Sequence, residues 1–180
     1  EQDRYPESYW NVSQPAAYYS SWFWFPTDFA ETFGPANWRL IIQWADPKSG
    51  EAGHFPTLNL AFQGDSKHRL MLCNNNWYRD GGSSSTKWDT GYTAANIPKE
   101  QWVHIVVYVK MSSNFRMLDG QATVWINGQK VLGRTDVALW NYYSTDNKGV
   151  CWGVGNYGKS VLPSSIWIDN VQVRDYCFWE

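Results

Sequence analysis

Apolar and polar residues alternate along most of this chain, with the two-residue period that is typical of β-strands. The alternating runs are rich in β-branched and aromatic residues, and clusters of Gly, Pro, Asn and Ser separate them. Helical periodicity is almost absent. The pattern predicts an all-β fold with strands at residues 18–25, 39–44, 57–62, 68–73, 102–110, 122–126, 129–131, 150–154 and 165–174.

Three connections between these runs have a recognisable character. Asn127-Gly128 separates VWI from QKV, and both residues tolerate the positive φ that a type I′ hairpin turn requires. Residues 80–86 (DGGSSST) are predicted to be a flexible polar loop, and residues 111–119 an irregular connection. No internal repeat is visible, so we expect a single domain over residues 1–180, built as an antiparallel β-sandwich.

Alternation also assigns the faces of the run at residues 39–46. Leu40, Ile42 and Trp44 form its apolar set and are expected in the core. This assignment leaves Arg39 and Gln43 on an open face of the sheet.

The run at residues 57–63 has the same arrangement. Leu58, Leu60 and Phe62 are predicted to be buried, so Asn59 lies on the opposite face. With the Arg and Gln of the preceding run, Asn59 would form a polar comb that offers donors and acceptors to sugar hydroxyls or carboxylates. The alternative is a solvated sheet face that binds nothing. In residues 102–110 the valines and the isoleucine at odd positions point inward, and His104 on the other face is interpreted as structural.

Aromatic residues are unusually frequent. The chain has 13 tryptophans and 11 tyrosines among 180 residues, whereas only 18% of its residues are charged. Flat rings fill protein cores, but they also form platforms on which sugar rings stack. We expect about half of them in the core, and we expect four as sugar platforms: Trp22, Trp77, Trp88 and Trp152.

Charge and hydropathy argue against other ligands. The 15 basic and 17 acidic residues give a formal net charge of −2 without a Lys/Arg stripe, so nucleic acid is not an expected partner. No apolar run approaches the roughly 20 residues of a membrane-spanning helix. The sequence starts at Glu1 without Met and carries a glycosylation sequon at Asn11, as a processed extracellular protein would. We therefore expect a secreted protein.

The three cysteines are too scattered for a zinc site, whose ligands usually come as close pairs. We predict a disulfide between Cys73 and Cys151, which both lie near strand ends, and a free thiol at Cys177. No metal site and no cofactor are predicted. A calcium ion that braces a loop is left open.

The order of several segments resembles a known family. ESYW, WFWFP, RLIIQWAD, IPKEQWVHIVVYVK, VWINGQKV, GVGNY and IWIDNVQV follow one another as in polysaccharide lyases of concanavalin-like jelly-roll fold, similar to heparin lyase I and glucuronan lyase. The resemblance spans most of the chain and implies a β-jelly roll. It also implies that Tyr157 is the catalytic base and acid, with Gln43 and Arg39 at the substrate carboxylate.

The chain departs from the family at two motif positions. The family's Gln-x-His reads QWA at residues 43–45, and its Lys-x-Gly-x-Tyr reads GVGNY at residues 153–157, so the histidine and the lysine are replaced. His54 is a candidate to substitute for the histidine in space. The family's early strand is also missing or truncated, which would leave one sheet edge open.

Three functions are weighed from these observations. The first is a secreted carbohydrate-binding jelly roll on a lyase-like scaffold, with catalysis weakened or lost. The second is an active lyase that performs β-elimination on an acidic polysaccharide with Tyr157. The third is an extracellular structural protein that self-associates through an open edge. A glycosidase pair of Asp46 and Asp169 is the weakest alternative. The saccharide hypotheses all assume that Arg39, Gln43 and Tyr157 converge in one trench.

Overall fold

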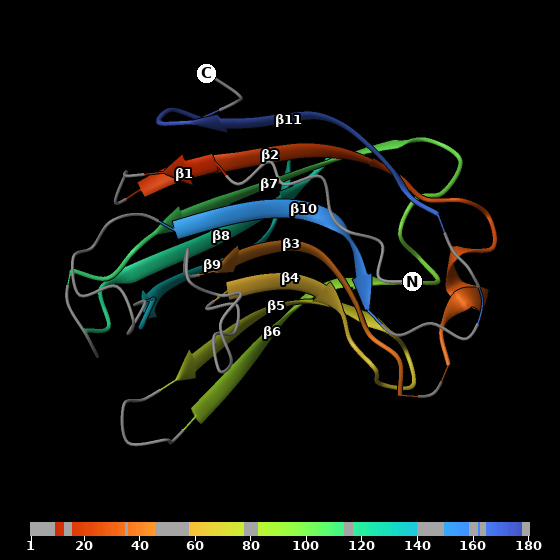
Figure 1. The fold of residues 1–180 in the computed structure, drawn as a ribbon, viewed down its shortest axis with the longest axis horizontal. Coiled ribbons are helices and arrows are strands. Elements are labelled where there is room, and N and C mark those ends of the chain that lie inside the picture. The colour runs from red at the N-terminus through yellow and green to blue at the C-terminus, as the bar shows by residue number, and fades with distance from the viewer. Residues whose placement is uncertain are drawn as a thin grey trace.

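Two antiparallel sheets lie face to face in a computed structural model of the chain (Figure 1). The structure describes residues 10–12, 16–34, 36–45, 58–77, 83–113, 117–139, 150–158, 162 and 165–177, with the backbone alone at residues 10–12, 45, 76–77, 83–84 and 150–151. The regular secondary structure in these ranges is all β apart from one short 3-10 helix, η1 (Phe29–Thr32). The prediction of an antiparallel β-sandwich is confirmed.

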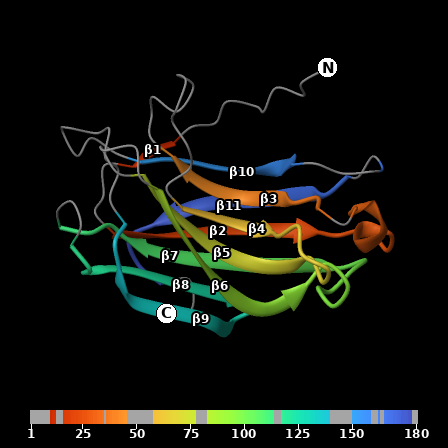
Figure 2. The same ribbon diagram turned by 90° about the horizontal axis from the view of Figure 1, so that it is seen from below.

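Sheet A has six strands and sheet B has five. In spatial order, sheet A consists of β1 (Trp10–Val12), β10 (Val150–Gly158), β3 (Arg39–Ala45), β4 (Leu58–Phe62), β5 (Arg69–Trp77) and β6 (Ser83–Thr93). Sheet B consists of β11 (Trp167–Arg174), β2 (Ala16–Trp24), β7 (Trp102–Lys110), β8 (Gly120–Ile126) and β9 (Gln129–Val137). The sheets contact each other on both sides: the edge strands β6 and β9 meet on one side, and β10, which lies next to the edge strand β1, meets β11 on the other (Figure 2).

Alternate positions on the strands fill the space between the sheets. The inward sets predicted on β4 and β7 are confirmed, because every member is at most 3% exposed: Leu58, Leu60, Phe62, Val103, Ile105, Val107 and Val109. On β3, Ile42 and Trp44 lie in the core as predicted, whereas Leu40, although only 7% exposed, is not part of the core cluster. The ring of Tyr19 lies 5.2 Å from those of both Trp44 and Trp152, and burial raises the pKa of its hydroxyl to about 12. Many of the aromatic residues therefore belong to the core.

Two local predictions, a hairpin turn and a polar loop, have different outcomes. The hairpin at Asn127-Gly128 is confirmed, since φ is 50° at Asn127 and 79° at Gly128, as a type I′ turn requires. The predicted loop at residues 80–86 is wrong from Ser83 onward, because these residues begin β6 and pair with β5. A polar Ser/Thr run has no apolar alternation, and its strand is stabilised by pairing with a neighbour.

β1 covers the edge of sheet A that was expected to be open. Trp10 lies opposite Trp152, so a short strand pairs with β10. Self-association through a sheet edge stays a prediction. No helix among the described residues is long and apolar enough to cross a bilayer.

Two irregularities in sheet A decide which side chains share a face. On β3, Leu40 pairs with Ala61 and Ile42 with Leu60, so Ile41 is an extra residue relative to β4. On β10, the pairing with β3 shifts between Val154 and Tyr157. Because side chains alternate between the two faces with a period of two, one extra residue places each side chain beyond it on the face opposite to the one that alternation predicts.

Candidate functional site

A row of side chains crosses the outer face of sheet A, which points away from sheet B. Gly153 on β10 pairs with Gln43, Gln43 with Asn59, Asn59 with Cys73, and Cys73 with Lys87 on β6. Residues paired across antiparallel strands point to the same side. We call these five residues the outer row. It crosses five strands and is about 19 Å long.

The neighbouring positions show that this row faces outward. On β3, β4, β5 and β10, the core contains the residues that flank the row: Ile42, Trp44, Leu58, Leu60, Leu72 and Trp152. Cys73 is buried but is not part of the core cluster. The row is therefore separated from the sandwich interior by the sheet itself.

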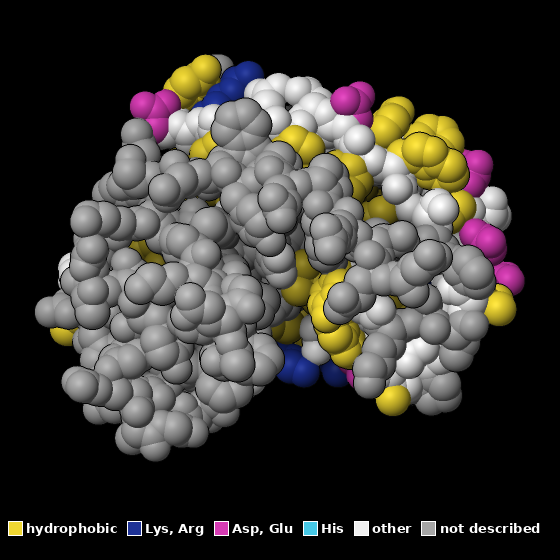
Figure 3. Space-filling view, viewed as in Figure 1, with side chains coloured by type: hydrophobic (Ala, Val, Ile, Leu, Met, Phe, Trp, Pro, Cys, Tyr) yellow, Lys and Arg dark blue, Asp and Glu magenta, His cyan; other side chains and the backbone are white. Residues whose placement is uncertain are grey.

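Lys87 gives one end of the outer row a positive charge. Its Nζ donates a hydrogen bond to Oε1 of Gln63 at 2.7 Å, and Nε2 of Gln63 donates to Sγ of Cys73 at 3.1 Å. Burial raises the pKa of the Cys73 thiol to about 11, so the thiol is neutral. Figure 3 shows Lys and Arg side chains at its lower middle, below a strip of apolar side chains, and others near its upper edge. The half-buried amide of Gln43 and the exposed ammonium of Lys87 are thus aligned where a carboxylated sugar chain could lie, with Asn59 between them only 7% exposed.

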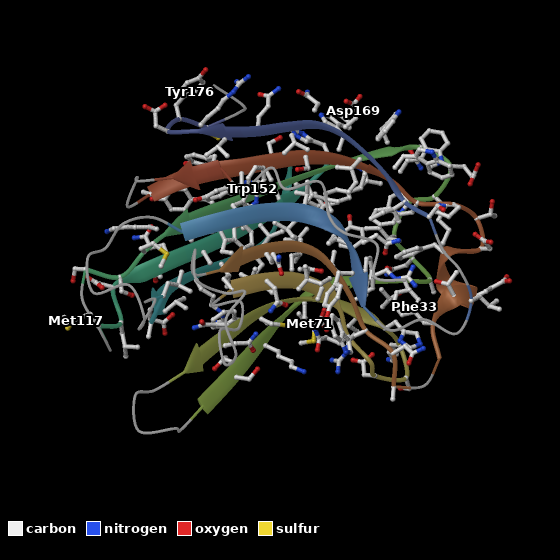
Figure 4. All side chains as sticks on the ribbon, in the orientation of Figure 1. Phe33, Met71, Met117, Trp152, Asp169 and Tyr176 are labelled. Atoms are coloured by element: carbon white, nitrogen blue, oxygen red, sulfur yellow. The ribbon has the colours of Figure 1, made fainter. Side chains whose placement is uncertain are left out.

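A second row runs parallel to the outer row and brings in the tyrosine. Tyr157 pairs with Leu40, Leu40 with Ala61, Ala61 with Met71, and Met71 with Asp89. Met71, labelled in Figure 4, lies near the middle of sheet A. Tyr157 shares the face of Gln43 and Asn59 as predicted.

Tyr157 is an accessible aromatic residue on this face. Half of its surface is exposed (51%), and its ring meets that of Trp38 edge-on at 5.3 Å. A phenolic hydroxyl that is exposed beside amide groups could exchange protons with a bound sugar.

The two departures from the family motifs also lie at this site. Ala45 pairs with Cys151 two residues along β3 from Gln43, and Gly153 pairs with Gln43 itself. A Cβ atom added at Gly153 would meet nothing within 4 Å. Among the described residues, nothing therefore occupies the position that carries a lysine in the family.

Arg39 does not share this face, and its predicted placement is wrong. The extra residue in β3 puts Arg39 opposite Phe62 on the core side of the sheet, where it is only 2% exposed. Its guanidinium lies 4.8 Å from the ring centre of Phe33 and 5.5 Å from that of Phe29. Burial lowers the pKa of Arg39 to about 10, so it stays charged at neutral pH. Arg39 contributes to packing at the end of the sandwich.

We expect Arg39→Ala to reduce the free energy of unfolding by about 2–4 kcal/mol, because both the cation–π contacts and the buried stem are lost. Arg39→Met keeps an unbranched stem over the rings and should lose roughly half as much. Urea denaturation midpoints measure both changes. Arg39→Met should also retain polysaccharide binding. Lost binding in a stable Arg39→Met protein would show that Arg39 contacts the ligand.

The tryptophans predicted as sugar platforms are dispersed. Trp152 is 1% exposed and packs in the core, so it offers no platform. Trp88 is half-buried against the core, with the guanidinium of Arg134 at 5.8 Å from its ring centre. Trp22 lies on the outer face of sheet B, and the side chain of Trp77 lies outside the described part of the structure. None of the three described rings lies on the face of Gln43 and Tyr157.

The contacts of His104 agree with the structural role expected from the sequence. Its ring stacks on that of Trp22 at 4.4 Å and 6°, and Nε2 lies 2.7 Å from Oγ of Ser20. Burial lowers the pKa of His104.

The predicted trench of Arg39, Gln43 and Tyr157 therefore forms only in part. Gln43 and Tyr157 share one face with Asn59, and Arg39 is on the other. Sequence reasoning missed Lys87 because the strand that carries it has no apolar alternation and was expected to begin as a loop. A saccharide site on this face would therefore be formed without Arg39.

The predicted disulfide is wrong as well. Cys73 is a free cysteine, and the strands that carry it and Cys151 are separated by β3 and β4. Three strand spacings amount to about 14 Å, well beyond the reach of a disulfide. Cys177 is free as expected.

Among the described residues, no group of three or more His, Cys, Asp or Glu could hold a metal ion. His54 and Asp46 lie outside these residues, and the bracing calcium ion stays untested.

A two-sheet sandwich with polar groups in register across one sheet defines a class of β-jelly rolls, and solved structures of this fold include several lyases. An endo-β-1,4-glucuronan lyase from the fungus Trichoderma reesei is similar over 88% of this chain and 67% of its own, with a TM-score of 0.64 and 19% identity. A family 7 alginate lyase in complex with substrate is similar over 92% and 62% of the two chains (TM-score 0.51, 14% identity). An alginate lyase from Chlorella virus covers 92% and 73% (TM-score 0.50, 13% identity). At these identities the likeness shows the fold.

A family model described as polysaccharide lyase matches residues 7–172. The chain belongs to the polysaccharide lyase family. It spans about two thirds of the length of the glucuronan lyase and 62% of that of the family 7 alginate lyase. No curated protein matches it in a sequence search.

Proposed function

We propose that this chain binds an acidic polysaccharide across the outer row of sheet A, as a secreted protein whose β-elimination activity is weak or lost. The observation that carries the proposal is the register itself, which aligns Gln43, Asn59 and Lys87 on one face with Tyr157 beside them. Amide groups suit sugar hydroxyls, and the ammonium of Lys87 suits a uronate carboxylate. Membership of the lyase family supports a polysaccharide ligand.

Weak catalysis follows from what the face lacks. β-Elimination requires a base for the C5 proton, an acid for the leaving oxygen and neutralisation of the carboxylate. Tyr157 could exchange both protons, but Ala45 and Gly153 stand where the family has a histidine and a lysine. Without these partners the charge that develops in the transition state is less stabilised, whereas ground-state binding is retained.

We expect Lys87→Ala to weaken binding to alginate or glucuronan by roughly tenfold, the value of one charge-assisted contact of about 1.4 kcal/mol. Affinity gel electrophoresis at two salt concentrations measures the effect, and wild-type binding should fall as salt rises. Gln43→Ala should weaken binding without changing the salt dependence. Lys130→Ala, an exposed lysine on β9 in the other sheet, is the matched control and should bind normally. Equal losses in Lys87→Ala and Lys130→Ala would mean that attraction is only a net-charge effect.

An active lyase is the second candidate, and one observation favours it. Tyr157 is exposed on the face of Gln43, where a family acid and base would stand. Ultraviolet absorbance of the unsaturated product during incubation with glucuronan or alginate distinguishes the two candidates. Turnover that Tyr157→Phe abolishes would establish the lyase in place of the binding protein.

A further inference from the structure

The outer face of sheet B carries a row of three tryptophans that the proposed function does not use. Trp167 on β11 pairs with Trp24 on β2, and Trp24 pairs with Trp102 on β7. We call these three residues the tryptophan row. Two strand spacings separate its ends, so it is about 10 Å long.

The residues next to this row show that the indoles point outward. Phe23 and Val103 belong to the core, and Ile168 packs against it. Trp167 is 54% exposed and Trp102 is 40% exposed, while Trp24 between them is half-buried. The rings of Trp24 and Trp102 meet edge-on at 5.8 Å and 72°, so they hold each other in place without stacking face to face.

The adjacent positions on the same strands support the row. Asp169, Trp22 and His104 are paired in register next to it. The Trp22 ring stacks on His104, whose imidazole contacts the buried Ser20. These contacts make a rigid base, and they place the exposed carboxylate of Asp169 beside the indoles.

Two acidic side chains lie near the row among the described residues. Asp169 and Glu100 are exposed, and Glu100, two residues before Trp102, accepts hydrogen bonds from the backbone and the hydroxyl of Thr27. Lys99 is the nearest lysine in sequence, and its Nζ donates to the Ala95 carbonyl at 2.7 Å. In Figure 3 the apolar patch at the upper right lies between acidic side chains, without a Lys or Arg beside it. Such a border repels uronate chains, nucleic acid and anionic lipid.

We propose that the tryptophan row is a second carbohydrate-binding site, separate from the outer row of sheet A, which takes a neutral polysaccharide. The C–H faces of pyranose rings would stack on the indoles, and sugar hydroxyls would bind the indole N–H groups and the carboxylate of Asp169. The length of the row suits a short run of linked sugars. Sheet A would hold the acidic chain and sheet B a neutral one on the opposite side of the sandwich.

The test is affinity electrophoresis in gels that contain hydroxyethylcellulose, soluble β-glucan or alginate. The neutral polymers should retard the wild-type protein, and Trp102→Ala/Trp167→Ala should weaken that retardation roughly tenfold or more, the value expected for two lost aromatic contacts. Met117→Ala/Leu118→Ala removes two other exposed apolar side chains and is the matched control, which should be retarded normally. Lys87→Ala should also be retarded normally by the neutral polymers, so the two sites fail independently.

Three results would overturn the proposal. The first is a wild-type protein that no neutral polymer retards. The second is alginate retardation that depends on the tryptophan row, because the acidic border should exclude it. The third is a concentration-dependent dimer in sedimentation velocity that Trp102→Ala/Trp167→Ala abolishes, which would assign the row to a second copy of the chain. Trp167→Phe, which keeps an aromatic ring, should retain most of the binding and shows that the fold tolerates change there.

Discussion

Ala45→His/Gly153→Lys is expected to increase β-elimination of glucuronan or alginate by about 100-fold or more over the wild type, in the range that positioned acid–base partners contribute. The space for the lysine exists, because a Cβ at Gly153 would meet nothing within 4 Å. Position 153 lies opposite Gln43 on the face of Tyr157. A cation there would favour the tyrosinate that removes the C5 proton and would stabilise the negative charge that develops.

The measurement is the initial rate of absorbance increase from the product with a C4–C5 double bond. The matched control adds Tyr157→Phe to the same double variant and should return the rate to the wild-type level. A double variant that folds and binds polysaccharide but forms no product would show that Tyr157 is not positioned for elimination. If instead the wild-type protein forms product as fast as the double variant, the conclusion that its catalysis is weakened is wrong.

Gly158→Ala is expected to lower the free energy of unfolding by about 3 kcal/mol or more, the range of severe steric conflict in a packed site. Its new Cβ would stand 2.0 Å from the Trp38 carbonyl oxygen and 2.9 Å from the Arg39 Cα. Both are backbone atoms of the neighbouring strand and its approach, so they cannot move without separating β10 from β3. The urea denaturation midpoint measures the loss.

Gly153→Ala on the same strand is the matched control, since its Cβ enters open space. This variant should change the free energy of unfolding by less than about 1 kcal/mol. The change should be an increase, because alanine reduces the conformational entropy of the unfolded chain. A small effect at both glycines would mean that β10 and β3 do not approach as closely as the structure has them. A large effect at Gly153 would mean that the space beside Gln43 is filled.

Alternation in the sequence predicts the fold well because burial repeats every two residues. Nine predicted strands, the Asn127-Gly128 hairpin, and the inward sets of β4 and β7 all follow from local chemistry, and the structure confirms them, whereas β1 and β6 were not predicted. β6 was missed entirely, because its Ser and Thr residues carry no apolar period. Its residues form a strand through pairing with β5, and that pairing brings Lys87 to the site.

The sequence also carries the motif positions that bear on function. Gln43, Asn59 and Tyr157 share a face, as alternation and the family resemblance imply, and Ala45 and Gly153 show which partners of the tyrosine are missing. Arg39 could not be placed in this way. Leu40, Ile41 and Ile42 are all apolar, so nothing in the pattern reveals that Ile41 is the extra residue that turns Arg39 toward Phe29 and Phe33.

By itself, then, the sequence determined the two-layer β architecture, the family and the residues from which a saccharide site can be built. Only the tertiary structure decided which of them meet. It buried Trp152, turned Trp88 against the core, aligned Lys87 with Gln43 across β4 and β5, and set Trp24, Trp102 and Trp167 side by side on the other sheet. The physical reason is that alternation is local, whereas register and the choice of inner face depend on which strands pair and on where one extra residue interrupts the period.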